Sequence, residues 1–119
     1  MTYTVENKEL IIRNGAEKEV WRGRPEGHDV EWASTVPFSD DGIVLYHYYR
    51  PERPYGGFQN LVRVRPDGSI VWRTDLPSSD DKYVYAALRD YRLYATSYGG
   101  FEVEIDINTG RIIERRFVK

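Results

Sequence analysis

The sequence predicts an all-β domain built from three small antiparallel units, and two observations carry that prediction. Short runs rich in Val, Ile, Tyr and Trp alternate with turn residues along the chain, as is typical of strands. A hairpin pattern, NLVRVRPDGSIVW at 60–72, has partial copies, FEVEIDINTGRIIE at 101–114 and ELIIRNGAEKEVW at 9–21. These copies divide the single 119-residue domain, 1–119, into units at about 2–22, 30–74 and 82–117.

The first unit is expected to contain three strands, at 3–6, 10–13 and 18–22. Asn14-Gly15 lies between apolar runs and predicts a tight type I′ hairpin, because both residues tolerate positive φ. The segment GRPEGHD that follows has two Gly and one Pro, which predicts a loop to the next unit.

The second unit is expected to contain four strands, at 30–36, 43–49, 60–65 and 69–74. In the first of them, period-two alternation places Val30 and Trp32 on the same face. Residues 43–49 form an almost unbroken apolar and aromatic run, which is typical of a central strand covered on both faces. The segment RPERPYGG after it predicts a loop.

The third unit repeats this plan, with strands expected at 83–88, 92–98, 101–107 and 111–117. One alternative stays open, because apolar residues in 83–95 also recur at helical spacing. The density of Tyr favours strands there.

The third unit resembles a blade of quinoprotein-type (PQQ-like) β-propellers, in which the pattern Asp-x-x-Thr-Gly-x-x-x-Trp docks one blade on the next. Asp106, Thr109 and Gly110 match that pattern, and Glu114 stands at the place of the tryptophan. The second unit has the matching glycine and tryptophan, with Arg65 in place of the aspartate. The chain is also similar to short uncharacterised bacterial proteins built from such repeats. The resemblance implies that Trp72 is buried between units.

A closed propeller needs about four to eight blades of roughly 40 residues, more than this chain holds. Either several chains complete a propeller-like ring, or the units pack on each other as a compact, sandwich-like body. We expect the second arrangement, because it avoids long exposed edge strands.

Composition and motifs exclude several kinds of chemistry. The chain has no cysteine, and 17 basic against 19 acidic residues give a net charge of −2, so thiol chemistry is absent and nucleic acid is not an expected partner. Residues 106–110 begin like a calcium loop but lack its later acidic ligand. His28-Asp29, Asp40-Asp41 and Asp80-Asp81 form no recognisable catalytic set. We therefore expect no metal and no cofactor, and enzymatic activity stays open but is not favoured.

The stretch YHYYRPERPYGGF at 46–58 alternates aromatic and arginine side chains next to a Pro/Gly-rich loop. Tyr and Arg are enriched in interface hot spots, and loops on rigid scaffolds often carry them. The residues expected to bind a partner are Tyr49, Arg50, Arg53, Tyr55 and Phe58. The alternative without a binding role is that the tyrosines fill space between sheets and the arginines are ordinary solvated charges.

These observations predict a non-enzymatic protein–protein interaction module, such as a bacterial immunity or inhibitor protein. The alternative is a small-ligand-binding or enzymatic β-propeller formed by oligomerisation, as the resemblance would imply. The N-terminal residues lack the apolar core of a secretory signal, and no run approaches the ~20 apolar residues of a membrane span. We therefore expect a cytoplasmic protein without membrane contact, either a monomer or a small homo-oligomer.

Overall fold

The computed structural model describes residues 1–118 and is all-β apart from one 3-10 turn, Pro25–Gly27. The first sheet has the order β1-β2-β3, with β1 (Thr2–Glu6), β2 (Glu9–Arg13) and β3 (Glu19–Gly23). The second has the order β4-β5-β6-β7, with β4 (Val30–Thr35), β5 (Gly42–Tyr46), β6 (Leu61–Val64) and β7 (Ile70–Arg73). The third has the order β11-β10-β9-β8, with β8 (Tyr83–Arg89), β9 (Arg92–Ser97), β10 (Phe101–Ile105) and β11 (Ile112–Phe117).

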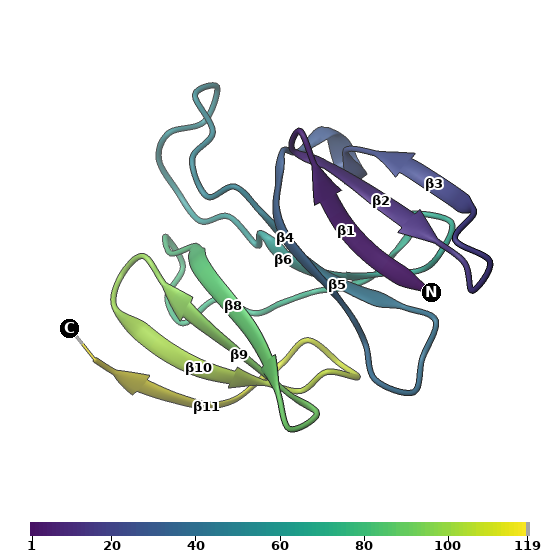
Figure 1. Cartoon of the computed structure of the whole chain (residues 1–119). Helices are drawn as coiled ribbons and strands as arrows, with labels where there is room; N and C mark the ends of the chain where they lie inside the picture. The colour runs from purple at the N-terminus through teal and green to yellow at the C-terminus, as the bar shows by residue number, and fades with distance from the viewer. Residues whose placement is uncertain (119) are drawn as a thin grey trace.

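All strand pairs are antiparallel, and none of the sheets within residues 1–118 closes into a barrel (Figure 1). The all-β class and the division into three, four and four strands are therefore confirmed. The helical alternative for 83–95 is wrong, because β8 and β9 occupy this segment as a hairpin.

The second sheet is the middle layer of a sandwich-like stack. Its Val44 and Val62 join a core cluster with Leu10 of the first sheet, while Ile43 and Leu45 join a second cluster with the third sheet. Every residue of β5 is buried, since both of its faces are covered. The predicted central strand is confirmed.

The strand β5 ends at Tyr46, three residues earlier than predicted, at a point where a buried asparagine links it to the third sheet. The Asn60 side-chain amide donates to the carbonyls of Tyr46 (2.9 Å) and Tyr83 (2.7 Å) and accepts the Tyr83 backbone N–H (2.8 Å). These bonds tie the end of β5 to the start of β8 in the third sheet. The His47 backbone N–H still donates to the Asp29 carbonyl (2.9 Å), and the chain from there to residue 57 forms a loop.

The type I′ turn predicted at Asn14-Gly15 is wrong. The Asn14 side chain accepts the backbone N–H groups of Ala16 (2.9 Å) and Lys18 (3.0 Å), which stabilises a longer loop whose positive φ is at Glu17. Neither Asn14 nor Gly15 has the positive φ that this turn type requires.

The shared face predicted for Val30 and Trp32 is also wrong, because a β-bulge lies between them. A bulge shifts the side chains that follow it relative to the partner strand. Val30 consequently packs toward the first sheet, and Trp32 packs against the core between the second and third sheets.

Tryptophan side chains dock each sheet on a turn of the next. Trp72 is 8% exposed, its indole N–H donates to the Ile107 carbonyl (3.0 Å), and a Cβ added at Gly110 would lie 2.6 Å from its ring. Trp21 stands in the same relation to Gly68, where an added Cβ would lie 2.4 Å from the indole. The predicted burial of Trp72 between units is confirmed.

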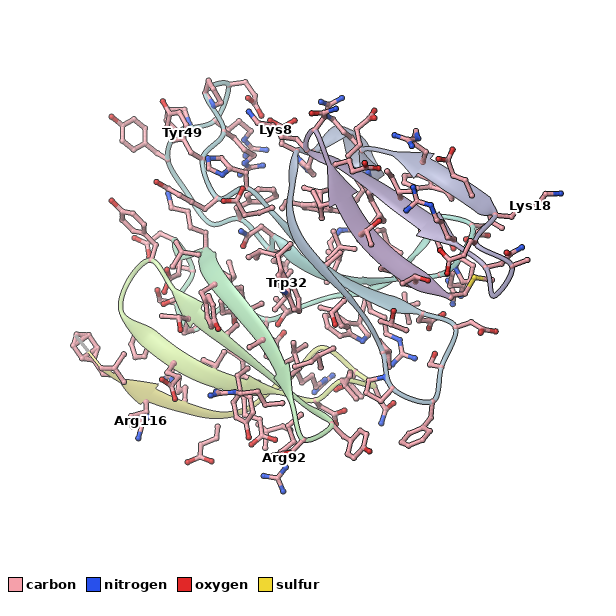
Figure 2. The ribbon with its side chains drawn as sticks, in the orientation of Figure 1. Lys8, Lys18, Trp32, Tyr49, Arg92 and Arg116 are labelled. Carbon is pink, nitrogen blue, oxygen red and sulfur yellow. The ribbon has the colours of Figure 1, made fainter. Side chains whose placement is uncertain are left out.

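Both outer faces of the stack are charged. On the first sheet, Arg22 pairs with Glu6, Glu9 and Glu19. On the third sheet, pairs join Arg116 to Glu102 (2.9 Å) and Arg92 to Glu104 (3.9 Å), and Figure 2 labels both arginines. Within the described residues, no helix has the length and apolar composition needed to cross a membrane.

Candidate functional site

The loop at 47–57 extends beyond the sheets between β5 and β6 (Figure 1). Two of the predicted contact residues lie on it with large exposed rings: Tyr49 is 51% exposed and Tyr55 is 88% exposed. Figure 2 labels Tyr49 on this projecting segment. Exposed aromatic side chains on a projecting loop are accessible to a partner.

Arg50 and Arg53 lie on the same loop, and within residues 1–118 neither has a carboxylate oxygen within 4.0 Å. The Arg50 guanidinium instead lies 3.7 Å from the centre of the Phe58 ring and makes one long contact to the Gly57 carbonyl (3.5 Å). Burial, followed by the neighbouring charge of Arg53, lowers the pKa of Arg50. The two positive charges are therefore adjacent, neither forms an ion pair within residues 1–118, and the Glu52 carboxylate offsets part of the charge at Arg50.

Phe58 differs from the other predicted contact residues, because it is only 8% exposed and belongs to the core cluster beside the first sheet. Its ring centre lies 4.8 Å from that of His28 and 6.2 Å from that of Tyr46. Phe58 offers little contact area of its own. It forms a rigid aromatic support on which Arg50 rests.

A polar hollow of about 420 Å³ lies beneath the loop. Its charged and aromatic lining includes Glu26, His28, Tyr46, Arg50, Arg53, Phe58 and Arg73. We call it the arginine hollow.

Two hydrogen bonds occupy the single carboxylate that lines the arginine hollow. Glu26 pairs with Arg73 and accepts the Tyr46 hydroxyl (3.1 Å). Burial, with the nearby Glu26 carboxylate, raises the pKa of Tyr46, so its hydroxyl stays protonated and donates. Burial also lowers the pKa of His28, which keeps its imidazole neutral at pH 7.

The third sheet adds two residues beside the loop that sequence reasoning missed. The rings of Tyr48 and Tyr98 are stacked with centres 5.8 Å apart, and the Lys82 ammonium lies 4.9 Å from the Tyr98 ring centre. Lys82 and Tyr98 are far from the loop in sequence. An isolated β-bridge between Phe58 and Lys82, together with the side-chain bonds of Asn60, brings them near, and no local pattern indicates these contacts.

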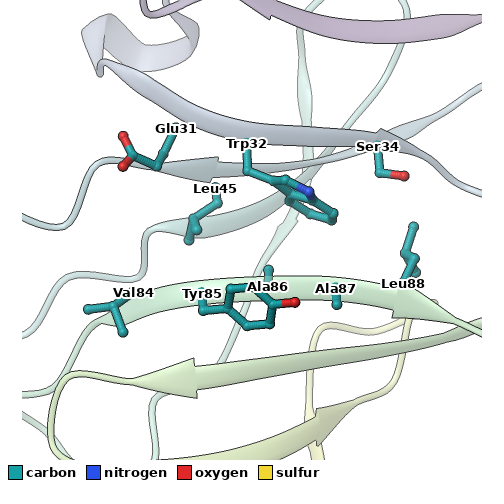
Figure 3. Close-up of a pocket in the computed structure, with 9 residues that line it drawn as sticks. All are labelled: Glu31, Trp32, Ser34, Leu45, Val84, Tyr85, Ala86, Ala87 and Leu88. Atoms are coloured by element: carbon teal, nitrogen blue, oxygen red, sulfur yellow. The ribbon is translucent and has the colours of Figure 1, made fainter.

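A second concave region, of about 500 Å³, lies between the edge strands β4 and β8 (Figure 3). In Figure 3, Trp32 extends from β4 toward β8, where Tyr85 and Ala86 line the opposite wall. Glu31 is the one ionisable carboxylate along this groove. The groove is suited to apolar contacts, and it lacks paired acids and bases for proton transfer.

The acidic pairs noted in the sequence have structural contacts. Asp41 accepts the Arg63 guanidinium (2.9 Å), which also reaches the Ile107 carbonyl of the third sheet (2.9 Å). Buried Asp81 accepts the backbone N–H groups of Lys82 (2.8 Å) and Gly99 (2.9 Å). Among the described residues, His, Cys, Asp and Glu side chains form no group of three or more that could hold a metal ion.

Fold and site together define a domain of three stacked antiparallel sheets with a projecting cationic and aromatic loop. The chain belongs to the family described as a domain of unknown function, DUF7957, whose model matches residues 33–117. The match covers nearly all of the second and third sheets together with the loop between β5 and β6. No curated protein matches the chain.

Proposed function

We propose that this protein is a non-enzymatic interaction module that binds another protein through the loop surface formed by Tyr49, Arg50, Arg53 and Tyr55. One observation carries the proposal: two arginines that form no ion pair within residues 1–118 share a segment that projects from the sheets with two exposed tyrosines. An immunity or inhibitor protein that covers a partner's site is the form of binding that we favour.

The base of the loop is well supported, which favours binding. Asn60 anchors the end of β5, and the buried Phe58 ring carries Arg50. Tyr and Arg side chains supply large contact areas with polar ends, and a supported loop loses less conformational entropy on binding. The surface therefore has the composition and the support of a protein-binding site.

We also propose that the three sheets are propeller-type blades in an incomplete series. The support is the repeated docking of Trp21 on Gly68 and of Trp72 on Gly110, which follows the order of the sheets. The alternative function, a ligand pocket inside a ring of several chains, would require the charged outer faces to pack on each other. We therefore favour the interaction module.

Site-specific photocrosslinking in cells tests the proposed function. Tyr55 is replaced by p-benzoylphenylalanine in one strain, and the exposed Tyr91, on the β8–β9 turn, is replaced in a control strain. We expect a discrete adduct of fixed mass from position 55 and none of that mass from position 91. Mass spectrometry of the adduct then identifies the partner.

Charge reversal supplies the second arm of that experiment. Arg50→Glu with Arg53→Glu is expected to abolish the adduct. Arg65→Glu with Arg111→Glu changes two exposed arginines on other turns and is expected to leave it intact. The absence of an adduct at position 55, or its survival in the Arg50 and Arg53 variant, would contradict the proposed function.

A further inference from the structure

We propose that the arginine hollow receives a carboxylate from the partner, supplied by an Asp or Glu side chain of an acidic segment that lies across the loop surface. The inference rests on the proposed function and adds the chemistry of the contact. It assigns the hollow, rather than the exposed tyrosines alone, as the site that selects the partner.

The first argument is the balance of charge around the hollow. Three arginines line it, and Glu26 is the one carboxylate among the lining residues. Because Glu26 already pairs with Arg73 and accepts the Tyr46 hydroxyl, its carboxylate is not available to pair with Arg50 or Arg53. Within residues 1–118, Arg50 and Arg53 form no ion pair, and the single nearby charge of Glu52 offsets at most one of them, so an added anion would compensate the remaining charge.

The second argument is the orientation of Arg50. Its guanidinium carbon lies 3.7 Å from the centre of the buried Phe58 ring, and the Nη2 group makes a long contact to the Gly57 carbonyl (3.5 Å), which leaves the other N–H groups of the planar group available. A planar carboxylate matches this edge with two parallel hydrogen bonds. The stacking restricts the arginine before binding, which reduces the entropy lost when a carboxylate pairs with it.

The remaining groups that face the hollow are compatible with a single carboxylate. His28 packs against Tyr46 and Phe58, with ring centres 4.8 Å apart in both cases, and its neutral imidazole has one N–H to donate. Glu52 lies near Arg50 and His28 and opposes a second bound anion. A volume of about 420 Å³ accommodates a side chain with its flanking backbone.

The third argument concerns the length of the partner segment. The Lys82 ammonium lies on the Tyr98 ring without a carboxylate within 4.0 Å among residues 1–118, and Tyr98 stacks on Tyr48 next to the loop. Cationic charge therefore continues from the hollow toward the third sheet. An acidic stretch of several residues fits this arrangement better than one isolated carboxylate does.

Nucleic acid is the competing polyanion, since single strands also use stacked aromatics and arginine. The net charge of −2 and the carboxylates of Glu26 and Glu52 beside the arginines oppose a continuous phosphate backbone. A protein segment with spaced carboxylates avoids that repulsion. We therefore assign the hollow to an acidic protein segment.

Nuclear magnetic resonance titration of the ¹⁵N-labelled 119-residue chain tests the inference without knowledge of the partner. The probes are a blocked hexaglutamate peptide, a blocked hexaglutamine peptide of the same length, succinate, inorganic phosphate and a decathymidine oligonucleotide. We expect hexaglutamate to shift the side-chain Nε–Hε resonances of Arg50 and Arg53 and hexaglutamine to leave them in place. Increasing salt should weaken the hexaglutamate binding.

Paired variants give the control. Arg50→Gln with Arg53→Gln is expected to lower the hexaglutamate affinity by at least about 10-fold, because each charge-assisted hydrogen bond is stronger than a neutral one. Arg65→Gln with Arg111→Gln is expected to keep it. Circular dichroism and thermal unfolding of both variants verify that they are folded.

Four outcomes would overturn the inference: equal shifts with hexaglutamine, tighter binding of the oligonucleotide, equal affinity for succinate or phosphate, or unchanged affinity in the Arg50 and Arg53 variant. The two proposals fail separately. A crosslink at position 55 that persists in Arg50→Gln with Arg53→Gln leaves the interaction module standing and removes the carboxylate site. Loss of every adduct at position 55, with hexaglutamate binding intact, removes the proposed function and leaves an anion site.

Discussion

Asn60 is the single residue on which the placement of the loop surface depends most directly. It is fully buried, and its side-chain amide donates two hydrogen bonds and accepts one, which together join the end of β5 to the start of β8. A buried backbone N–H or C=O group without a hydrogen-bond partner destabilises the folded state, because the same group is hydrogen-bonded to water in the unfolded chain. This residue therefore fixes both where the loop begins and how the second and third sheets meet.

We expect Asn60→Ala to lower the free energy of unfolding by about 3 kcal/mol, because it removes the partners of the Tyr46 and Tyr83 backbone groups. Urea unfolding followed by tryptophan fluorescence measures the change. Asn108→Ala is the matched control, since Asn108 is exposed on a turn and its side chain makes no hydrogen bond within residues 1–118. Equal stability of the two variants would show that the amide is not a structural link.

We expect His28 to make the stability of the fold depend on pH. Burial lowers its pKa in the folded state, whereas the unfolded chain has a pKa of about 6.5. The unfolded state therefore binds a proton first, so the stability present above pH ~6.5 is lost as the pH falls below that value toward the folded-state pKa.

The expected measurement is a lower urea midpoint at pH 5.5 than at pH 7.5 in the parent protein, with a smaller difference in His28→Gln. The imidazole resonance of His28 should titrate below pH ~6.5 in the folded protein. An imidazole that titrates at or above that value, or an unchanged pH dependence in His28→Gln, would refute the assignment of this pH effect to His28.

At the scale of elements, the contact between a tryptophan strand and a glycine turn repeats along the molecule. Trp21 at the end of the first sheet meets Gly68 in the β6–β7 turn, and Trp72 meets Gly110 in the β10–β11 turn. Each turn glycine has a positive φ and no space for a side chain. The turn conformation and the docking of the tryptophan therefore both require glycine at this position of the turn.

Gly68→Ala is expected to cost roughly 2–5 kcal/mol, the sum of strain at positive φ and of overpacking against Trp21. Gly27→Ala is the control, because Gly27 also has a positive φ but has no atom within 4 Å of an added Cβ. That control should cost only the strain of about 1–2 kcal/mol. Thermal or urea unfolding compares them, and equal losses would mean that the docking contact contributes nothing.

Trp72→Ala tests the same docking from the other side. The indole fills space between the second and third sheets and donates to the Ile107 carbonyl, so its removal should cost about 3–5 kcal/mol. Tyr55→Ala, which truncates an aromatic ring that is 88% exposed, should change stability by less than about 0.5 kcal/mol. A Trp72→Ala variant as stable as the parent would contradict the role of Trp72 as a link between sheets.

The sequence predicts structural features that depend on residues close together in the chain, and it misses features that depend on contacts between residues far apart in the chain. The hairpins around Gly68 and Gly110 follow from local turn chemistry and strand alternation, and so does the buried strand β5. The end of β5 at Tyr46 depends on Asn60 and Tyr83, and the cluster of Tyr48 with Tyr98 depends on the packing of two sheets. Four of the predicted contact residues lie at or near the surface, while Phe58 is buried because it packs on His28 and Tyr46.

At the scale of the whole molecule, both outer faces of the three stacked sheets carry paired charges. Terminal units of stacked repeats require polar outer faces. On the first sheet, Ile11 is fully buried although it points away from the core, and Thr4 and Arg22 flank it in the strand register. Arg22 and its glutamate partners form a charged layer on that face. The third sheet ends in a similar layer of paired Arg and Glu side chains.

This arrangement predicts a monomer, because a ring of several chains would bury the paired charges of both outer faces. Light scattering after size-exclusion chromatography should give one species near 14.0 kDa over a wide range of concentration. The variant Glu102→Leu with Glu104→Leu and Arg116→Leu replaces the charged layer of the third sheet by an apolar one, and we expect it to self-associate. Exposed Arg65→Leu, on the β6–β7 turn, is the control and should remain monomeric. If the parent protein forms stable trimers or larger rings, the ion pairs of the outer faces lie in an interface between chains. The proposal of a ligand pocket inside a ring would then replace the proposal of a single-chain interaction module.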